Sequence, residues 1–274
     1  MRSGFRNMIK TTFSAVSLLA LLMLAGCDKL TDWYLGIPLQ PDFTEKSFEP
    51  GMNIFGVLRP DSTGGYNNSF VYVQQVLPAV GDTSSAWEVT DASVGVIAGL
   101  NTEYPMVFPF SNLHQDTQSE RAFYRPEADF NPQPGELYQL YCLAEGLPVL
   151  EAETRVPEQP EIIEGSLSIA AGMVSFTVLT DSACHLLDVY LVSGTVHQTK
   201  RLVPGAGGST EISFSTAADI SHGSLMIYAY DRHLASYYVT SNVSVNFNKF
   251  RRPYSTVRGG YGVFGAINML IEAY

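Results

Sequence analysis

Histidines and carboxylates are the side chains of this sequence best suited to acid–base chemistry. The five histidines, His114, His185, His197, His222 and His233, show no metal-site spacing such as His-x-x-x-His. Asp231-Arg232-His233 places an acid two residues from a histidine, as a catalytic dyad could. Such a triplet in a β-rich stretch is more often a surface turn than a dyad, so we predict a surface turn here.

Glycoside hydrolysis would need two carboxylates that face each other across a cleft. Glu151 and Glu153 alternate on one predicted strand, and Glu158, Glu161 and Glu164 flank a proline-rich linker, but their spacing does not place any pair in that way. A G-x-S-x-G nucleophile elbow and a D-x-D-x-D-G calcium loop are both missing from the sequence. We therefore predict no catalytic residue, no bound metal and no cofactor.

Covalent lipidation is the chemistry that the amino end indicates. Three basic residues, Arg2, Arg6 and Lys10, precede an apolar run from Ala15 to Ala25, which is shorter than the roughly 20 residues of a membrane-spanning helix. Leu24-Ala25-Gly26-Cys27 then matches the bacterial lipobox. We predict a signal peptide over residues 1–26 that is cleaved before a lipidated Cys27; the alternative is an N-terminal anchor helix that is never cleaved.

Residues 27–50 are rich in Pro, Asp, Thr and Gly, and we expect them to tether the lipid to the first strand. Two or three acyl chains on Cys27 would make the membrane attachment stable. Asp28 and Asp32 lie where residues steer sorting between membranes, but these sorting rules differ among bacterial groups.

The charge of the mature chain argues against nucleic acid as a partner. Removing the three basic residues of the signal peptide from 16 leaves 13 Lys and Arg against 27 Asp and Glu, a formal charge of −14. Nucleic acids and anionic membrane surfaces both bind basic patches. The one local basic cluster, Arg251-Arg252, is predicted to be a solvated turn.

Short β-branched and aromatic segments recur from residue 51 to residue 157, with turn residues between them. The predicted strands are 53–58, 70–77, 89–97, 136–144 and 149–156, and the last two form a hairpin that follows Pro132-Gln133-Pro134-Gly135. Residues 104–110 contain two prolines, which predicts an edge strand or an irregular one.

The prolines of Val156-Pro157-Glu158-Gln159-Pro160 predict a stiff linker, after which the strand pattern begins again. Further strands are predicted at 166–169, 174–179, 186–192, 200–203, 210–214 and 225–230, with an exposed loop at Pro204–Gly208. Leu234–Ser241 is predicted as a last strand or a short helical turn. We expect an all-β fold of two immunoglobulin/fibronectin-like β-sandwich modules in tandem, over residues 51–157 and 158–274.

The carboxyl-terminal segment alternates glycine with bulky residues in Arg258-Gly259-Gly260-Tyr261-Gly262-Val263-Phe264-Gly265. Glycine allows two backbones to approach closely, and Tyr261, Val263 and Phe264 could fill a groove. No lysine follows and no strand-then-helix context is evident, so a phosphate-binding loop is excluded. We predict a terminal strand docked on the body of the protein.

Cysteines and aromatic residues are open to two interpretations each. Cys142 and Cys184 lie in apolar runs, where a buried free thiol is favoured over one disulfide bond. The dipeptides Trp33-Tyr34 and Tyr237-Tyr238, and Trp87, could bind sugars or proteins, but packing in a core or at an edge is the default expectation.

Several segments, in order along the chain, resemble the Bacteroidetes lipoprotein family catalogued as domain of unknown function 4249. Besides the lipobox they are Ile54-Phe55-Gly56-Val57-Leu58, Val89-Thr90-Asp91-Ala92-Ser93-Val94, Pro134-Gly135-Glu136-Leu137-Tyr138-Gln139-Leu140, Ala152-Glu153-Thr154-Arg155-Val156-Pro157 and Gly259–Ala266. The second half looks short, with reduced insertion loops. The resemblance implies an envelope protein, commonly encoded beside TonB-dependent outer-membrane receptors, and it supplies no functional residues.

Two functional hypotheses follow. The first is a non-catalytic accessory or binding lipoprotein at the cell outer membrane, anchored through Cys27 and partnered by a TonB-dependent receptor protein, with an unknown small-molecule ligand. The second is an envelope hydrolase acting on polysaccharide or peptide, with carboxylates of both modules meeting at the linker.

Overall fold

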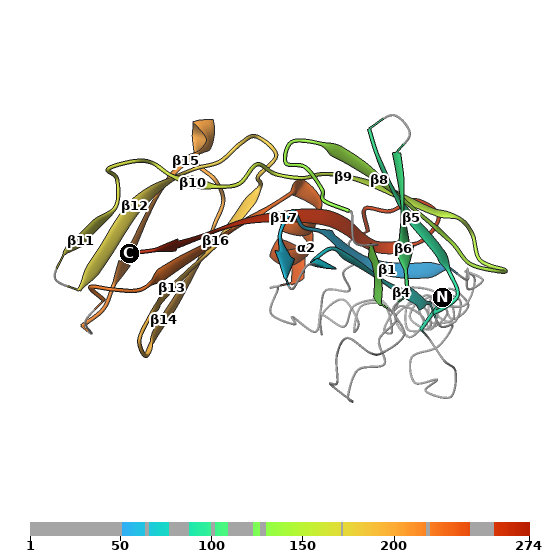
Figure 1. Ribbon diagram of the computed structural model, residues 1–274, viewed down its shortest axis with the longest axis horizontal. Coiled ribbons are helices and arrows are strands. Elements are labelled where there is room, and N and C mark those ends of the chain that lie inside the picture. Colours follow the sequence, from blue (N-terminus) through green and yellow to red (C-terminus); the bar gives the residue numbers. More distant parts are fainter. Residues whose placement is uncertain are drawn as a thin grey trace, which may run out of the picture. The chain divides into compact units, whose positions relative to one another are not determined.

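The computed structural model describes residues 51–63, 66–76, 88–99, 102–108, 123–126, 130–170, 172–217, 220–241 and 255–274. The predicted signal peptide, Cys27 and the tether lie outside these ranges. The described part is built mainly of β-strands (Figure 1). The strands form an eleven-stranded sheet, a four-stranded sheet and a small two-stranded one.

The first β-sandwich uses strands β1 (Met52–Leu58), β4 (Phe70–Gln75), β5 (Ser93–Ala98), β6 (Thr102–Val107), β7 (Phe123–Pro126), β8 (Leu137–Leu143) and β9 (Leu150–Arg155). Their hydrogen-bonded order is β1-β4-β7-β6-β5-β8-β9. The sheet folds over on itself and brings β9 close to the start of the last strand. Glu151 of β9 and Arg258, which lies just before that strand, exchange backbone hydrogen bonds of 2.9 and 2.7 Å. Between β1 and β4 in the sequence, two short strands, β2 (Ser62–Thr63) and β3 (Tyr66–Asn67), pair with each other.

Alternating apolar residues explain how these strands enclose a core. In β9, Leu150, Ala152 and Thr154 are buried while Glu151, Glu153 and Arg155 are exposed, as the period of two requires. The buried faces of the strands meet in one cluster that includes Met52, Val73, Val96, Tyr124, Leu140, Cys142 and Leu150. The predicted hairpin of residues 136–144 and 149–156 is confirmed as the antiparallel pair β8 and β9.

The second β-sandwich places one sheet against another. Strands β13 (Leu186–Ser193), β14 (Val196–Leu202) and β16 (Ser224–Tyr230) form one sheet, and β10 (Glu161–Ile162), β11 (Ser168–Ala170), β12 (Met173–Leu179) and β15 (Ser209–Ser215) form the other. A short 3-10 helix, η1 (Ala206–Gly208), precedes β15. Their inner faces bury a second cluster, with Phe176, Val189, Phe214 and Ile227 among its members. The predicted all-β fold of two sandwich modules is confirmed.

The last strand, β17 (Tyr261–Ala273), belongs to both sandwiches. Residues Tyr261–Ala266 pair in parallel with β1, and Ile267–Ala273 pair antiparallel with β16. The sequence predicted a docked terminal strand but gave no partner for it. Val263 and Phe264 are fully buried, whereas Tyr261 is 36 % exposed and does not fill a groove.

One helix, α2 (Arg232–Ser241), follows β16 directly, so the helical alternative for Leu234–Ser241 is the right one. Leu234 and Ala235 of this helix pack with Val57, Tyr230 and Val263 in a third, smaller core cluster. Within the described ranges, no helix is long and apolar enough to cross a membrane.

Pro105 does not lie on an edge strand, so the edge alternative predicted for residues 104–110 is wrong at this proline, while Pro109 lies outside the described residues. Strand β6 lies between β5 and β7, and Pro105 is aligned with Gly95 of β5. Pairing with β7 begins only after the proline, at Met106 and Val107. Pro105 has no backbone N–H to donate. A strand inside the sheet tolerates it here because β6 pairs with β7 only at the two residues that follow the proline.

Candidate functional site

Asp231, the acid of the candidate dyad, is a buried helix cap and not part of a surface turn. It stands between β16 and α2 and is 3 % exposed. The Leu234 N–H donates to its Oδ1 at 2.9 Å, which is the bond of an N-cap residue to the third helical residue. The Thr154 hydroxyl donates to Oδ2 at 2.7 Å. The surface-turn prediction is therefore wrong, because the helix start and β9 both need this carboxylate.

Burial raises the pKa of the Asp231 carboxyl, and the hydrogen bonds from Leu234 and Thr154 oppose that effect only in part. The imidazole of His233 lies 4.0 Å from Oδ2, beyond hydrogen-bond distance. The carboxylate therefore links β9 to the start of α2. Its partner Thr154 lies 77 residues before Asp231 in the sequence.

His233 makes its own contacts away from the carboxylate. Its Nδ1 lies 3.1 Å from the Phe264 carbonyl oxygen, which can only accept, so Nδ1 carries the proton. Its Nε2 lies 3.3 Å from the Arg232 guanidinium, which can only donate. A histidine in a dyad would point Nδ1–H at the carboxylate. Here the histidine instead ties α2 to β17.

A pocket of about 310 Å³ opens beside this cluster. We call it the junction pocket, because both sandwiches line it: Leu137, Glu153, Thr154 and Arg155 from the first and Ser182, Ala183, His185, Asp231, Arg232 and His233 from the second. Glu153, Arg155, His185 and Arg232 are exposed. The pocket therefore offers hydrogen-bonding groups of both charge signs to a small polar ligand.

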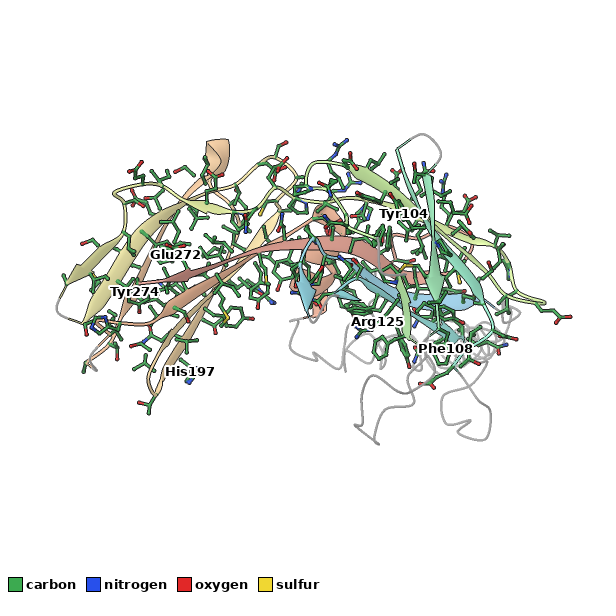
Figure 2. All side chains as sticks on the ribbon, in the orientation of Figure 1. Tyr104, Phe108, Arg125, His197, Glu272 and Tyr274 are labelled. Atoms are coloured by element: carbon green, nitrogen blue, oxygen red, sulfur yellow. The ribbon has the colours of Figure 1, made fainter. Side chains whose placement is uncertain are left out.

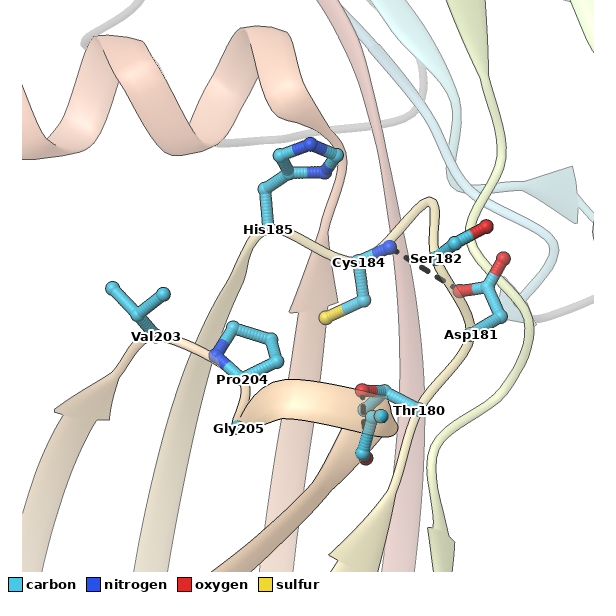
Figure 3. Close-up of a pocket in the computed structure, with 10 residues that line it drawn as sticks. Thr180, Asp181, Ser182, Cys184, His185, Val203, Pro204 and Gly205 are labelled. Carbon is cyan, nitrogen blue, oxygen red and sulfur yellow. Dashed lines mark hydrogen bonds between the residues drawn. The ribbon is translucent and has the colours of Figure 1, made fainter.

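A larger pocket, of about 520 Å³, lies next to it and shares Ser182 and His185 with it (Figure 3). We call it the loop pocket, because it is lined by residues 180–182, 184 and 185 and by residues 203–205, 207 and 208 of the glycine-rich loop. The Thr180 N–H and hydroxyl both donate to the Gly208 carbonyl, at 2.8 and 3.1 Å. Gly208 has a φ of 79°, and a Cβ there would lie 2.1 Å from the Thr180 oxygen, so only glycine fits.

Cys184 lines the loop pocket but is not built as a nucleophile. Burial raises the pKa of its thiol to about 12, and the sulfur donates to the Leu186 carbonyl at 3.4 Å. A reactive cysteine has a lowered pKa and some exposure. Cys142 is also free, its pKa is raised by burial to about 12, and it lies in the first core. The two cysteines belong to different core clusters and are not bridged.

The remaining candidate residues do not gather at either pocket. Glu158 lies beside Gly135, while Glu161 and Glu164 line a third cleft at the side of the second sandwich. His197 lies at the tip of the hairpin formed by β13 and β14 (Figure 2). Within the described ranges no three His, Cys, Asp or Glu residues could hold a metal ion together. His114, Arg251-Arg252, Trp33-Tyr34 and Trp87 lie outside those ranges.

Tyr237 and Tyr238 are half-buried on α2 and pack against aromatic neighbours. Tyr237 lies 5.5 Å from the Phe55 ring, and Tyr238 lies 5.3 Å from the Tyr230 ring, measured between centroids. The Arg201 guanidinium stands 5.4 Å from the centre of the Tyr238 ring. Packing, the default expectation for these residues, is what the structure shows.

The sequence reasoning missed a buried ion pair next to these aromatics. Asp188 has a side chain only 2 % exposed and binds Arg201 through two hydrogen bonds of 2.7 and 2.6 Å. The Tyr230 hydroxyl donates to the same carboxylate at 3.1 Å. The sequence feature that could have indicated this ion pair is a single acid inside the apolar run Leu186–Val192, which lies opposite an arginine of the next strand. Such a pair fixes the register of the two strands.

Comparisons with known proteins give no family for the chain. No protein-family model matches it, and no curated protein does. Solved structures with a similar fold include a chicken interferon gamma receptor alpha chain, 9 % identical with a TM-score of 0.23, covering 67 % of this chain and 89 % of that one. A cytokine receptor complex is 12 % identical with a TM-score of 0.28, covering 80 % of this chain and 95 % of that one.

A third solved structure is a pullulanase from Anoxybacillus sp. complexed with maltotriose. It is 14 % identical with a TM-score of 0.23, and the match covers 68 % of this chain but 24 % of the pullulanase. At TM-scores this low, these likenesses carry no argument on function.

Proposed function

We propose that this chain is a non-catalytic lipoprotein of the cell outer membrane that works as an accessory or binding partner of a TonB-dependent receptor. The lipobox Leu24-Ala25-Gly26-Cys27, behind a basic segment and a short apolar run, carries the proposal. Diacylglycerol on Cys27 holds the protein at the membrane, and residues 28–50 connect it to the first sandwich. The resemblance to the domain of unknown function 4249 lipoproteins supports the receptor as partner.

The state of the reactive groups in the described residues supports a binding role. The Asp231 carboxylate caps a helix, the His233 ring bonds a backbone carbonyl, and the Cys184 thiol is protonated. None of the three is positioned to take a proton from a substrate or to attack one. The junction and loop pockets, lined by exposed polar groups, remain as places for a small ligand.

Mass spectrometry of the chain purified from membranes of its host tests the anchor. We expect a protein that begins at Cys27 and carries the added mass of diacylglycerol or of three acyl chains. Cys27→Ser should remain at full length, because the signal peptidase for lipoproteins requires the lipidated thiol. A wild-type chain that keeps residues 1–26 and no lipid would refute the anchor.

An envelope hydrolase remains the second candidate, since Glu161 and Glu164 line one cleft with Glu272. Its test is a screen of envelope polysaccharides and peptides for turnover. Turnover that Glu161→Gln or Glu164→Gln abolishes would favour the hydrolase over the binding protein, and an empty screen would reject the hydrolase.

A further inference from the structure

Strand β17 has an unpaired outer edge over its last residues. Its pairing with β1 ends at Ala266, while pairing with β16 continues to Ala273. Gly223 and Tyr274 exchange two backbone hydrogen bonds of 3.0 Å, and the Asp231 N–H donates to the Ala266 oxygen. Bonded pairs alternate along an antiparallel ladder. Ile271 and Ala273 therefore direct their N–H and C=O groups away from β16.

These four backbone groups face no backbone partner within the described part of the chain. Two residues before Ile271, the same edge of β17 does have a partner, because Gln159 Nε2 donates to the Met269 carbonyl oxygen at 2.9 Å. The Ile271 side chain beside the open groups is 57 % exposed. An exposed strand edge with an apolar side chain is a template for pairing with another strand.

The opposite edge of the same sheet is protected, which makes the open edge of β17 distinctive. Strand β14 carries Lys200 and Arg201, and charged side chains on an edge discourage pairing. The Gln198 side chain also donates to the Ser215 carbonyl at 3.0 Å, joining β14 to the end of β15. Residues 271–273 carry no Lys or Arg, and among the described residues no side-chain hydrogen bond caps their backbone groups.

The open edge borders a cleft of about 420 Å³, which we call the edge cleft. The cleft is lined by β17 on one side and by residues 159–167, around β10, on the other. Ile162, Leu167 and Leu270 line it and also pack against the second core, so its floor is apolar.

Three exposed glutamates, Glu161, Glu164 and Glu272, also line the edge cleft. Glu272 lies near the end of β17 (Figure 2). No Lys or Arg lines the cleft, and within the described ranges none of the three forms an ion pair. The negative charge is therefore available to a cationic occupant.

We propose that the edge cleft binds an extended segment of a partner protein that contains lysine or arginine. The segment adds a strand to the outer edge of β17, where its backbone pairs with Ile271 and Ala273. Its alternate side chains enter the apolar cleft and place cations against the glutamates. Main-chain bonds supply affinity in such strand addition, and the side-chain positions supply specificity. This inference rests on the proposed binding role, but not on the lipid.

Peptide binding to the full chain in detergent tests the inference. The probe is a fluorescent heptapeptide of alternating lysine and valine, followed by anisotropy, and the matched peptide alternates glutamate and valine. We expect saturable binding of the lysine peptide below about 1 mM, and at least about ten-fold weaker binding of the glutamate peptide. N-methylation of the lysine peptide at alternate amides should abolish binding, because it removes the backbone donors.

Variants of the protein separate the backbone from the charge. Ile271→Pro removes an N–H that does not bond β16, and should weaken binding at least about ten-fold, while Ile271→Ala keeps that N–H and most of the affinity. Glu164→Gln and Glu272→Gln should each cost about two- to five-fold. Glu211→Gln, on the exposed face of β15 and away from the cleft, is the matched control and should cost nothing.

Several outcomes would overturn the inference. These are equal binding of the two peptides, undiminished binding of the N-methylated peptide, no saturable binding, or undiminished binding by an Ile271→Pro variant that keeps its urea midpoint. If that variant does not fold, the N-methylated peptide and the glutamate variants decide. A dimer in sedimentation that Ile271→Ala or Glu272→Gln dissociates would instead assign the edge to a second copy. Failure of peptide binding leaves receptor co-purification, the test of the proposed function, unaffected.

Discussion

Gly262→Ala should destabilise the protein far more than Gly207→Ala, although both glycines have positive φ angles, of 105° and 80°. A Cβ at position 262 would lie 1.9 Å from the Ile54 carbonyl oxygen and 2.8 Å from the Ile54 nitrogen, both on the neighbouring strand β1. A Cβ at position 207 would meet nothing within 4 Å. The two substitutions share the backbone cost and differ in the contact between strands.

The magnitude follows from that difference. A left-handed conformation costs an alanine about 1–2 kcal/mol, which both variants lose. At position 262 the strands must also separate to relieve the overlap. Separation weakens the parallel pairing around Ile54↔Gly262 and withdraws Val263 and Phe264 from the core. Adding about 1 kcal/mol for each of two or three hydrogen bonds and about 1 kcal/mol from packing gives an expected loss of about 4–6 kcal/mol in total.

Urea unfolding of the full chain, followed by fluorescence and circular dichroism, measures both values. A loss of about 4–6 kcal/mol is a large fraction of the stability of an ordinary domain, so Gly262→Ala should be partly unfolded at 37 °C. Gly207→Ala should stay folded. Equal losses in the two variants, to within about 0.5 kcal/mol, would refute the close approach of β17 to β1.

Three further predictions concern buried polar groups and thiols. Burial raises the pKa of Asp231 above its ordinary value of 3.8, so the folded state holds a proton that the unfolded state has lost. The stability of the wild type therefore falls as pH rises from about 3.8 through the pKa of Asp231 in the folded state. Asp231→Asn should gain stability relative to the wild type over that range. A stability difference between the two proteins that does not change with pH would contradict this. Asp188→Ala should lower the free energy of unfolding by about 2–3 kcal/mol. This loss is smaller than that from breaking a fully buried ion pair, because the Arg201 side chain is about a third exposed. A double-mutant cycle with Arg201→Met that shows no coupling would contradict the ion pair. Cys142 and Cys184 should react with a thiol reagent only after unfolding in guanidinium, and rapid labelling of the native chain would contradict their burial.

Local patterns were sufficient to predict most strands and the all-β class, because the period of two and the turn residues are local signals. The predicted segments 53–58, 70–77 and 174–179 correspond to β1, β4 and β12. The partner of β17 could not be predicted, since strand pairing between residues about 200 positions apart leaves no local signal. The clash distances explain the glycines of that strand only once β1 is known to lie beside them.

The candidate sites show the same division. Asp231 was found as an acid near a histidine, but its role depends on Thr154 of the first sandwich, which sequence distance conceals. Asp188 could have been found, because an isolated acid in the apolar run Leu186–Val192 calls for a partner. The edge cleft follows from which strand edge remains open, a property of the finished sheet and not of any one segment.

Co-purification from detergent-solubilised outer membranes tests the central claim most directly. The wild-type chain, tagged at a site away from β17, should recover a TonB-dependent receptor in near-stoichiometric amount, and Cys27→Ser should not, since it leaves the chain unanchored. Recovery of no outer-membrane receptor with a correctly lipidated wild-type chain would contradict the account.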